Sequence, residues 1–189
     1  MGYIIISKKN NINLNYNCDN SNCISSNLNK FNYTIDLYRR TDSDKKELLL
    51  TLHGIYYDIK YAIKNNIDLK TLFNNENIST LVLDDYGEIK SEYLSSYYNM
   101  YYITDIEYHK FDYKYIDFLF NKLIEIIEYK DKLLVGNIII KPTLNYEVKE
   151  NPTIYYYKYI EELNKLYNIF IKNNFNEIDN SSYFIYTNE

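Results

Sequence analysis

The stretch YITDIEYHKFDYKYIDFLFNKLIEII, residues 102–127, combines a β-type run, a polar turn and an amphipathic helix. Apolar side chains recur in its second half at the spacing of one helix face, at Ile116, Leu119, Phe120, Leu123, Ile124 and Ile127. A helix that follows a strand points its N-terminal N–H groups at the turn, where many folds bind an anion. The turn contains no glycine, although glycine is what lets a backbone approach an anion closely. The stretch predicts a strand packed against a helix and leaves open whether the turn holds a ligand.

The flanking sequence predicts one mixed α/β domain over residues 1–189, because no repeat or linker divides it. Before the central stretch we expect strands at 2–7 and 12–17 around a turn at 8–11, a polar loop at 18–30, a hairpin of strands 31–40 and 47–59, a helix at 61–74, and a second hairpin of strands 79–85 and 88–96 around Gly87. After it we expect a strand at 133–141, a helix at 154–173, and a final strand pair, FNEID and YFIYT.

The composition is biased: the 189 residues include 25 tyrosines, 4 glycines and no tryptophan, with abundant Asn, Ile and Lys. All four abundant residue types have A/T-rich codons, so a biased genome explains the tyrosine content before any special role does. The net charge of −5 without a basic block argues against nucleic acid as a partner. It favours cationic partners only mildly.

Cysteines and histidines are too few for a recognisable metal motif. Cys18 and Cys23 are the only cysteines and His53 and His109 the only histidines, so a zinc site cannot be completed from these residue types at metal-motif spacing. The start MGYIIISKKNN resembles neither a signal peptide nor a myristoylation signal, and no stretch is apolar over a membrane-spanning length. We therefore expect a soluble, intracellular, cytoplasmic protein with no metal and no membrane association.

Residues 79–187 resemble the GCN5-related N-acetyltransferase (GNAT) family in the order and hydrophobic patterns of their expected elements. The resemblance is carried by STLVLDDYGEIKSEYLSS, MYYITDIEYHK, IDFLFNKLIEII, LVGNIIIKP and YKYIEELNKLYNIFIKNN, followed by the final strand pair. It implies a central twisted mixed sheet with helices on both faces, in which strands 100–109 and 133–141 are parallel neighbours. Residues 1–60 add more strands than the family usually has there.

The resemblance also implies a cofactor site, because the family holds the pyrophosphate of acetyl-CoA at the loop before the helix. If acetyl-CoA binds, Tyr108, Lys110, Lys114 and Tyr115 are the candidate contacts. The family's loop pattern is Arg or Gln, two residues, Gly, one residue, then Gly or Ala. The corresponding run here, FDYKYI at 111–116, has neither glycine and places the negative charge of Asp112 where a phosphate would lie.

The catalytic positions of the family match only in part. Its enzymes often use a tyrosine in a Tyr-x-x-x-Gly-Phe run to protonate the departing thiolate, but here Phe170 stands for the tyrosine and Asn174 for the glycine. Asn tolerates the left-handed conformation that ends such a helix. Tyr167, one turn earlier, is the nearest substitute acid.

A candidate general base remains on the central strand. Glu107 shares one strand face with Asp105 and His109, and the family commonly uses a glutamate on this strand to deprotonate the amine. The alternative is an exposed acidic strand end, with His109 at the surface and His53 structural.

Three functions remain open from the sequence. The first is a degenerate, non-catalytic GNAT-fold protein that binds no cofactor and acts through a protein partner or as a homo-oligomer, with the tyrosine-rich segments 93–102 and 155–159 as candidate surfaces. The second is an active acetyl-CoA-dependent N-acetyltransferase. The third is an unrelated α/β binding module.

Overall fold

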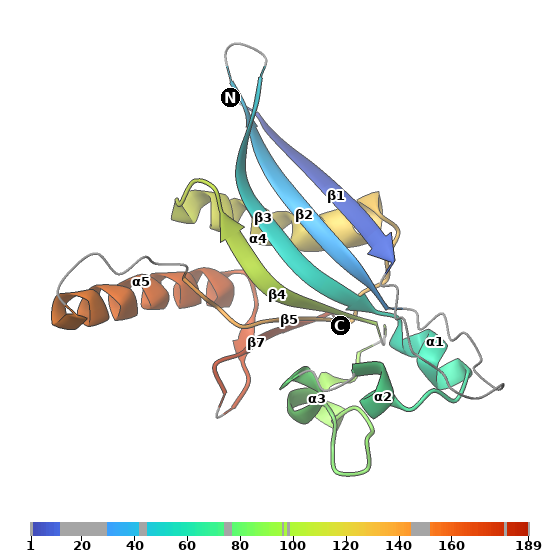
Figure 1. Ribbon diagram of the computed structural model, residues 1–189. Helices are drawn as coiled ribbons and strands as arrows, with labels where there is room; N and C mark the ends of the chain where they lie inside the picture. Colours follow the sequence, from blue (N-terminus) through green and yellow to red (C-terminus); the bar gives the residue numbers. More distant parts are fainter. Residues whose placement is uncertain are drawn as a thin grey trace, which may run out of the picture.

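A computed structural model describes residues 2–11, 30–41, 45–73, 77–95, 97, 99–144, 152–179 and 181–188, with backbone alone at 11 and 152–155. These residues build one twisted sheet with helices packed on both faces (Figure 1). The predicted mixed α/β class is therefore confirmed.

The sheet has seven strands in the described part of the chain, in the order β1-β2-β3-β4-β5-β7-β6. Their bounds are β1 Tyr3–Asn11, β2 Lys30–Arg40, β3 Lys46–Tyr57, β4 Met100–Tyr108, β5 Asn137–Ile140, β6 Asn176–Glu177 and β7 Phe184–Thr187. All neighbours are antiparallel except β4 and β5, which are parallel. The expected hairpin at 31–59, the N-terminal strand at 2–7 and the final strand pair are confirmed.

The parallel pair β4–β5 is short relative to β4. Its register runs from Met100 opposite Asn137 to Ile103 opposite Ile140, whereas β4 continues to Tyr108 beside β3 alone. β5 covers only four residues of the predicted strand 133–141. The two central strands are therefore adjacent and parallel, as expected, and separate after Ile103.

The short helices α1, α2, α3 and η1 lie between β3 and β4 in the chain, and the longer helices follow β4. Their bounds are α1 Ile59–Lys64, α2 Leu69–Phe73, α3 Asn77–Val82, the 3₁₀ turn η1 Ser91–Tyr93, α4 Tyr113–Ile124, the π-helical continuation η2 Glu125–Lys130, and α5 Pro152–Lys172. The predicted helix 61–74 is broken into α1 and α2 at Asn66, whose φ is +54°. The predicted amphipathic helix at 116–127 and the long helix at 154–173 are confirmed.

Alternate strand residues point into two separate cores, which is the expected consequence of the strand period of two. Tyr101 and Ile138 contribute to the first core, between the sheet and α4 and α5. Tyr102 and Ile139 contribute to the second core, beneath α1, α2 and α3. Figure 1 shows these three short helices gathered at one end of the sheet, so they cover only part of that face.

The turn predicted at residues 8–11 is wrong, because β1 continues through them opposite residues 31–34 of β2. The two lysine side chains have partners: Lys8 Nζ lies 2.8 Å from Asp36 Oδ2, and Lys9 Nζ donates to the carbonyl of Asp131 at 3.1 Å. A polar run can therefore pair as an edge strand. The predicted strand at 12–17 and the loop at 18–29, with Cys18 and Cys23, lie outside the described residues.

The hairpin predicted at 79–96 is also wrong. Residues 77–82 form α3, and 91–93 form η1, so only the isolated bridge between Leu83 and Ile89 remains of the expected pairing. Ile78 and Val82, four positions apart, are both buried in the second core, and this packing overrides the β propensity of the run. The turn itself is present, with Gly87 at a φ of +86°.

Candidate functional site

The loop from β4 to α4 ends in a helix cap supplied by Asp112. The backbone N–H groups of His109 and Lys110 both donate to the carbonyl of Leu49, at 3.1 and 3.0 Å, which ties the start of the loop to β3. Asp112 is extended, and its Oδ1 accepts the backbone N–H of Lys114 at 3.0 Å. A carboxylate of the chain itself therefore lies at the N-terminus of α4, where an anionic ligand would otherwise be favoured.

Lys114 completes the local charge balance. Its Nζ lies 2.6 Å from Asp112 Oδ2. The hydrogen bond from Lys114 is the main cause that holds the pKa of Asp112 below its ordinary value, so the carboxylate is charged at neutral pH. The negative charge predicted to oppose a phosphate is thus present and already neutralised within the loop.

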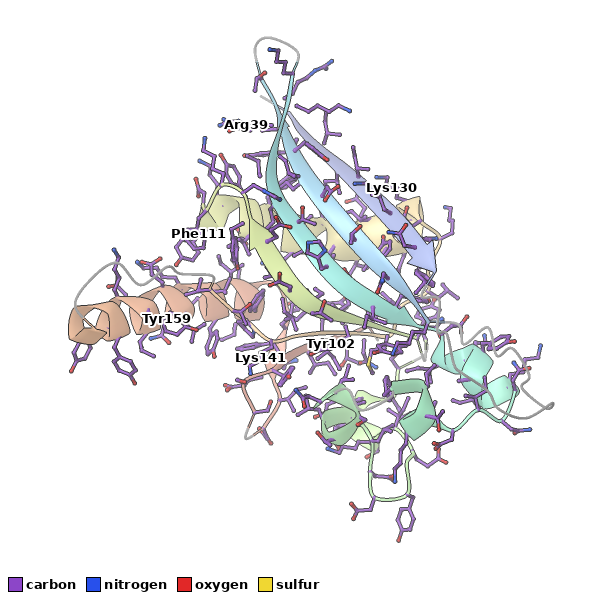
Figure 2. All side chains as sticks on the ribbon, in the orientation of Figure 1. Arg39, Tyr102, Phe111, Lys130, Lys141 and Tyr159 are labelled. Carbon is purple, nitrogen blue, oxygen red and sulfur yellow. The ribbon has the colours of Figure 1, made fainter. Side chains whose placement is uncertain are left out.

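Aromatic side chains fill the region where β4 and β5 separate. The rings of Tyr108 and Phe111 are 5.1 Å apart, and those of Phe111 and Tyr113 are 5.0 Å apart. The Tyr108 hydroxyl donates to the carbonyl of Thr143 at 3.3 Å, and the Tyr113 hydroxyl donates to the carbonyl of Glu162 at 3.1 Å. These contacts join β4, the loop, the segment after β5 and α5. Figure 2 labels Phe111 beside the end of β4.

The four candidate cofactor contacts are all engaged within the protein. Lys110 Nζ lies 3.5 Å from Glu47 Oε1, and Lys114 binds Asp112. Tyr115 is only 2 % exposed and packs edge-on against Tyr3. Burial raises the pKa of Tyr108, so its hydroxyl stays protonated. The loop therefore presents ion pairs and packed rings at the positions that the resemblance implies for acetyl-CoA.

Glu107 lies between the two histidines on the opposite face of the sheet. Its Oε2 is 3.1 Å from His53 Nε2, and its Oε1 is 3.5 Å from His109 Nε2, with 51 % of its side chain exposed. Ile106 points into the first core, so Glu107 faces away from α4 and α5. A solvent-accessible carboxylate flanked by imidazoles can accept a proton from an approaching ligand.

A polar network continues from His109 across the sheet. His109 Nε2 lies 3.4 Å from Thr51 Oγ1, and this hydroxyl donates to Asp36 Oδ1 at 2.9 Å. Burial favours a protonated Asp36, but hydrogen bonds from Lys8 and Thr51 outweigh it and hold the pKa of this carboxyl below its ordinary value. The same nitrogen of His109 faces both Thr51 and Glu107, whereas a proton relay needs one partner at each ring nitrogen. The network therefore contains no activated hydroxyl nucleophile.

The candidate acid Tyr167 is not brought to Glu107. Its ring lies 4.8 Å from that of Phe184 on the first-core side, and burial, with Glu177 nearby, raises its pKa. Phe170 is fully buried against Phe120. The predicted candidates for base and acid thus lie on opposite faces of the sheet.

Asn174 has a φ of +64° after the end of α5, which confirms the conformation expected of it as a substitute for glycine. Within the described ranges, no three His, Cys, Asp or Glu side chains are arranged to hold a metal, and no helix is long and apolar enough to cross a bilayer.

The contact between His53 and Glu107 and the hydrogen bonds of Thr51 were not predicted from the sequence. The signal that could have found them is the antiparallel register, which places Thr51 opposite Glu107 and His53 opposite Asp105. No protein-family model, curated protein or solved structure matches the chain, so its function is argued from this geometry.

Proposed function

We propose that this chain is a degenerate GNAT-fold protein that has lost acetyl-CoA binding and acts through contact with another protein chain. The observation that carries the proposal is the Asp112 carboxylate at the N-terminus of α4. It supplies the anion that this helix end favours, and so removes the reason for a phosphate to bind there.

The arrangement of the central strands supports the GNAT-like part of the proposal. The resemblance requires two adjacent parallel strands joined through a helix, and β4, α4 and β5 have this arrangement. Antiparallel or separated strands would have excluded the resemblance. The family holds its cofactor at the end of the strand that corresponds to β4 and at the loop that follows it, which here are Tyr108 and residues 109–112.

Three physical effects oppose acetyl-CoA in that region. Asp112 already supplies an anion at the N-terminus of α4 and accepts the N–H of Lys114. The same carboxylate pairs with the Lys114 ammonium, the nearest cation, and Tyr108, Phe111 and Tyr113 occupy space with side chains. A hydrogen bond to a charged oxygen contributes about 1.5–3 kcal/mol. Losing two or three of them lowers affinity by several powers of ten, at about 1.4 kcal/mol for each tenfold change.

The absence of a general acid opposes catalysis, independently of cofactor binding. The position that the family gives to its acid is Phe170, which has no proton to donate and is fully buried. Tyr167 packs against Phe184 on the other side of the sheet from Glu107. Two independent losses, one in binding and one in chemistry, favour a non-catalytic role.

One observation favours the alternative of an active N-acetyltransferase. Glu107 keeps the half-exposed position of a general base and is flanked by His53 and His109. That alternative needs acetyl-CoA to bind, whereas a base on its own performs no acetyl transfer. Cofactor binding therefore separates the two functions.

A thermal melt with and without acetyl-CoA tests the proposal. A ligand held with a Kd one hundredth of its concentration stabilises the native state by about 2.7 kcal/mol. For a chain of this size this corresponds to an increase in Tm of about 5–10 °C. We expect no change in Tm with acetyl-CoA. We also expect none with coenzyme A, which serves as a second test ligand. A shift of that size would favour the active N-acetyltransferase over the non-catalytic protein.

A further inference from the structure

The apolar stripe of α5 extends beyond the part of the helix that packs on the sheet. Its members recur at helical spacing on one face: Tyr156, Tyr159, Ile160, Leu163, Leu166, Tyr167 and Phe170. Leu166 and Phe170 are fully buried in the first core, and Tyr159 and Leu163 pack against it. The residues of the stripe are therefore partly buried from Tyr159 onward and fully buried toward the C-terminal end of α5.

In the N-terminal turns of α5 the stripe is exposed, because none of the described residues packs over it. Tyr156 is 60 % exposed, Tyr157 beside it is 71 % exposed, and Ile160 is 36 % exposed. The rings of Tyr156 and Tyr157 touch each other edge-on, with centroids 5.9 Å apart. Figure 1 shows this end of α5 extending past the strands, away from the sheet.

A projecting helical end gains little stability from its own hydrogen bonds, because most helical stability in proteins comes from packing one apolar face. We infer that Tyr156, Tyr157 and Ile160 form the contact through which two copies of this chain associate, helix against helix. This inference rests on the proposed function, since it names the partner of a protein that acts through contact.

The charges favour a second copy over a partner of opposite charge. The chain carries a net charge of −5, yet the stripe itself holds no charged side chain. The charged side chains on these turns are balanced, with Lys158 and Lys165 against Glu161 and Glu162, so two copies meet here without an excess of like charge. A strongly basic partner would find no excess of negative charge beside this stripe.

The exposed area sets the strength of the contact. With about 200 Å² for a whole tyrosine, Tyr156 and Tyr157 together expose about 260 Å² per copy. Two copies then bury well under the 1,200–2,000 Å² or so of a stable complex, and contacts of that size are weak and transient. We expect a dimer with a Kd of about 10 µM to 1 mM rather than a permanent one.

Sedimentation velocity from about 5 µM to 1 mM protein, a range chosen to span that Kd, measures the association. The test variant is Tyr156→Glu with Tyr157→Glu, since glutamate keeps helix propensity and places charge in the contact. The matched control is Tyr86→Glu with Tyr129→Glu, which changes net charge equally at tyrosines 92 and 71 % exposed. Circular dichroism establishes that each variant is folded before it is compared.

We expect the unmodified chain and the control to shift from monomer to dimer with concentration, and the test variant to stay monomeric. A monomeric unmodified chain at every concentration, or a test variant that dimerises like the control, would overturn the inference. Either result leaves the proposed function intact if acetyl-CoA still fails to bind, because the partner would then be another protein. Binding of acetyl-CoA would remove the proposed function whatever the oligomeric state.

Discussion

The Oδ1 of Asp112 accepts the backbone N–H of Lys114 at 3.0 Å, while its Oδ2 lies 2.6 Å from the Nζ of the same lysine. One carboxylate therefore caps α4 and neutralises the nearest cation. A helix N-terminus with this cap has little affinity left for an external anion.

Replacing Asp112 by Ala should destabilise the protein by about 1 kcal/mol, the usual cost of removing an N-cap side chain. Asp112→Asn should cost less, because the amide oxygen still accepts the N–H of Lys114. Urea denaturation of the three proteins measures both differences. Equal losses in the two variants would mean that charge, rather than the cap, is what Asp112 contributes.

The cap should also make stability depend on pH. The pKa of Asp112 is lowered on folding, mainly by the hydrogen bond from Lys114, so its charged form is stabilised in the native state. This contribution is fully present above the ordinary value of 3.8 and is lost as the pH falls through the lowered value. The stability gap between the unmodified protein and Asp112→Asn should therefore shrink below that pH. A gap that stays constant through acid titration would contradict the assigned ion pair.

Gly136→Ala should destabilise by about 3 kcal/mol or more, because a Cβ there would collide with the backbone carbonyl of Tyr97. That carbonyl cannot rotate away as a side chain can. Gly2→Ala is the control, since a Cβ at Gly2 meets nothing within 4 Å. Thermal unfolding of both variants measures the difference. A Gly136→Ala protein as stable as Gly2→Ala would show that Ser95 and Tyr97 do not lie against Gly136.

Phe170→Tyr restores the residue type that the GNAT resemblance implies for the acid, yet it should destabilise by about 1–3 kcal/mol. The Phe170 ring contacts those of Phe120, Phe175 and Phe184, so the added hydroxyl would be buried against aromatic carbon. Tyr167→Phe, at a half-buried position, should change stability by less than about 1 kcal/mol. Unfolding by guanidinium separates the two cases. A stable Phe170→Tyr protein would mean that this helix face is more open than its packing indicates.

The pair of His53 and Glu107 should couple weakly. Both side chains are substantially exposed, at 39 and 51 %, and exposed ion pairs contribute about 0.2–1 kcal/mol. A double-mutant cycle with His53→Ala and Glu107→Gln measures the coupling directly. A coupling well above about 1 kcal/mol would identify a rigid, functional pair and would strengthen the enzyme alternative.

The sequence predicts the elements whose patterns are long. The helix face from Ile116 to Ile127 and the strand at 100–109 are both present, because repeated apolar spacing commits a segment to one buried face. For short segments the prediction fails where tertiary packing, rather than the local pattern, determines the secondary structure. The first part of the predicted strand 79–85 lies in α3, because Ile78 and Val82 pack in the second core. The polar residues 8–11 extend β1, because they pair with β2.

The site is predictable only within single segments. Period-two spacing places Glu107 correctly on a strand face, and the missing glycines of the loop are visible in the sequence. The pairing of His53 with Glu107 depends on the register of two strands about fifty residues apart in the chain, which the sequence alone does not give. The contact of Tyr113 with Glu162 likewise depends on how α5 packs beside α4.

Isothermal titration of the unmodified protein with acetyl-CoA tests the loss of cofactor binding most directly. Asp112→Asn serves as the comparison, because it keeps the cap and removes the charge. We expect no measurable binding up to about 1 mM ligand by the unmodified protein, a concentration at which a Kd in the micromolar range would saturate it. We expect little gain in the variant, since Tyr108, Phe111 and Tyr113 still fill the region. Saturable binding with a micromolar Kd by the unmodified protein would contradict the proposed function.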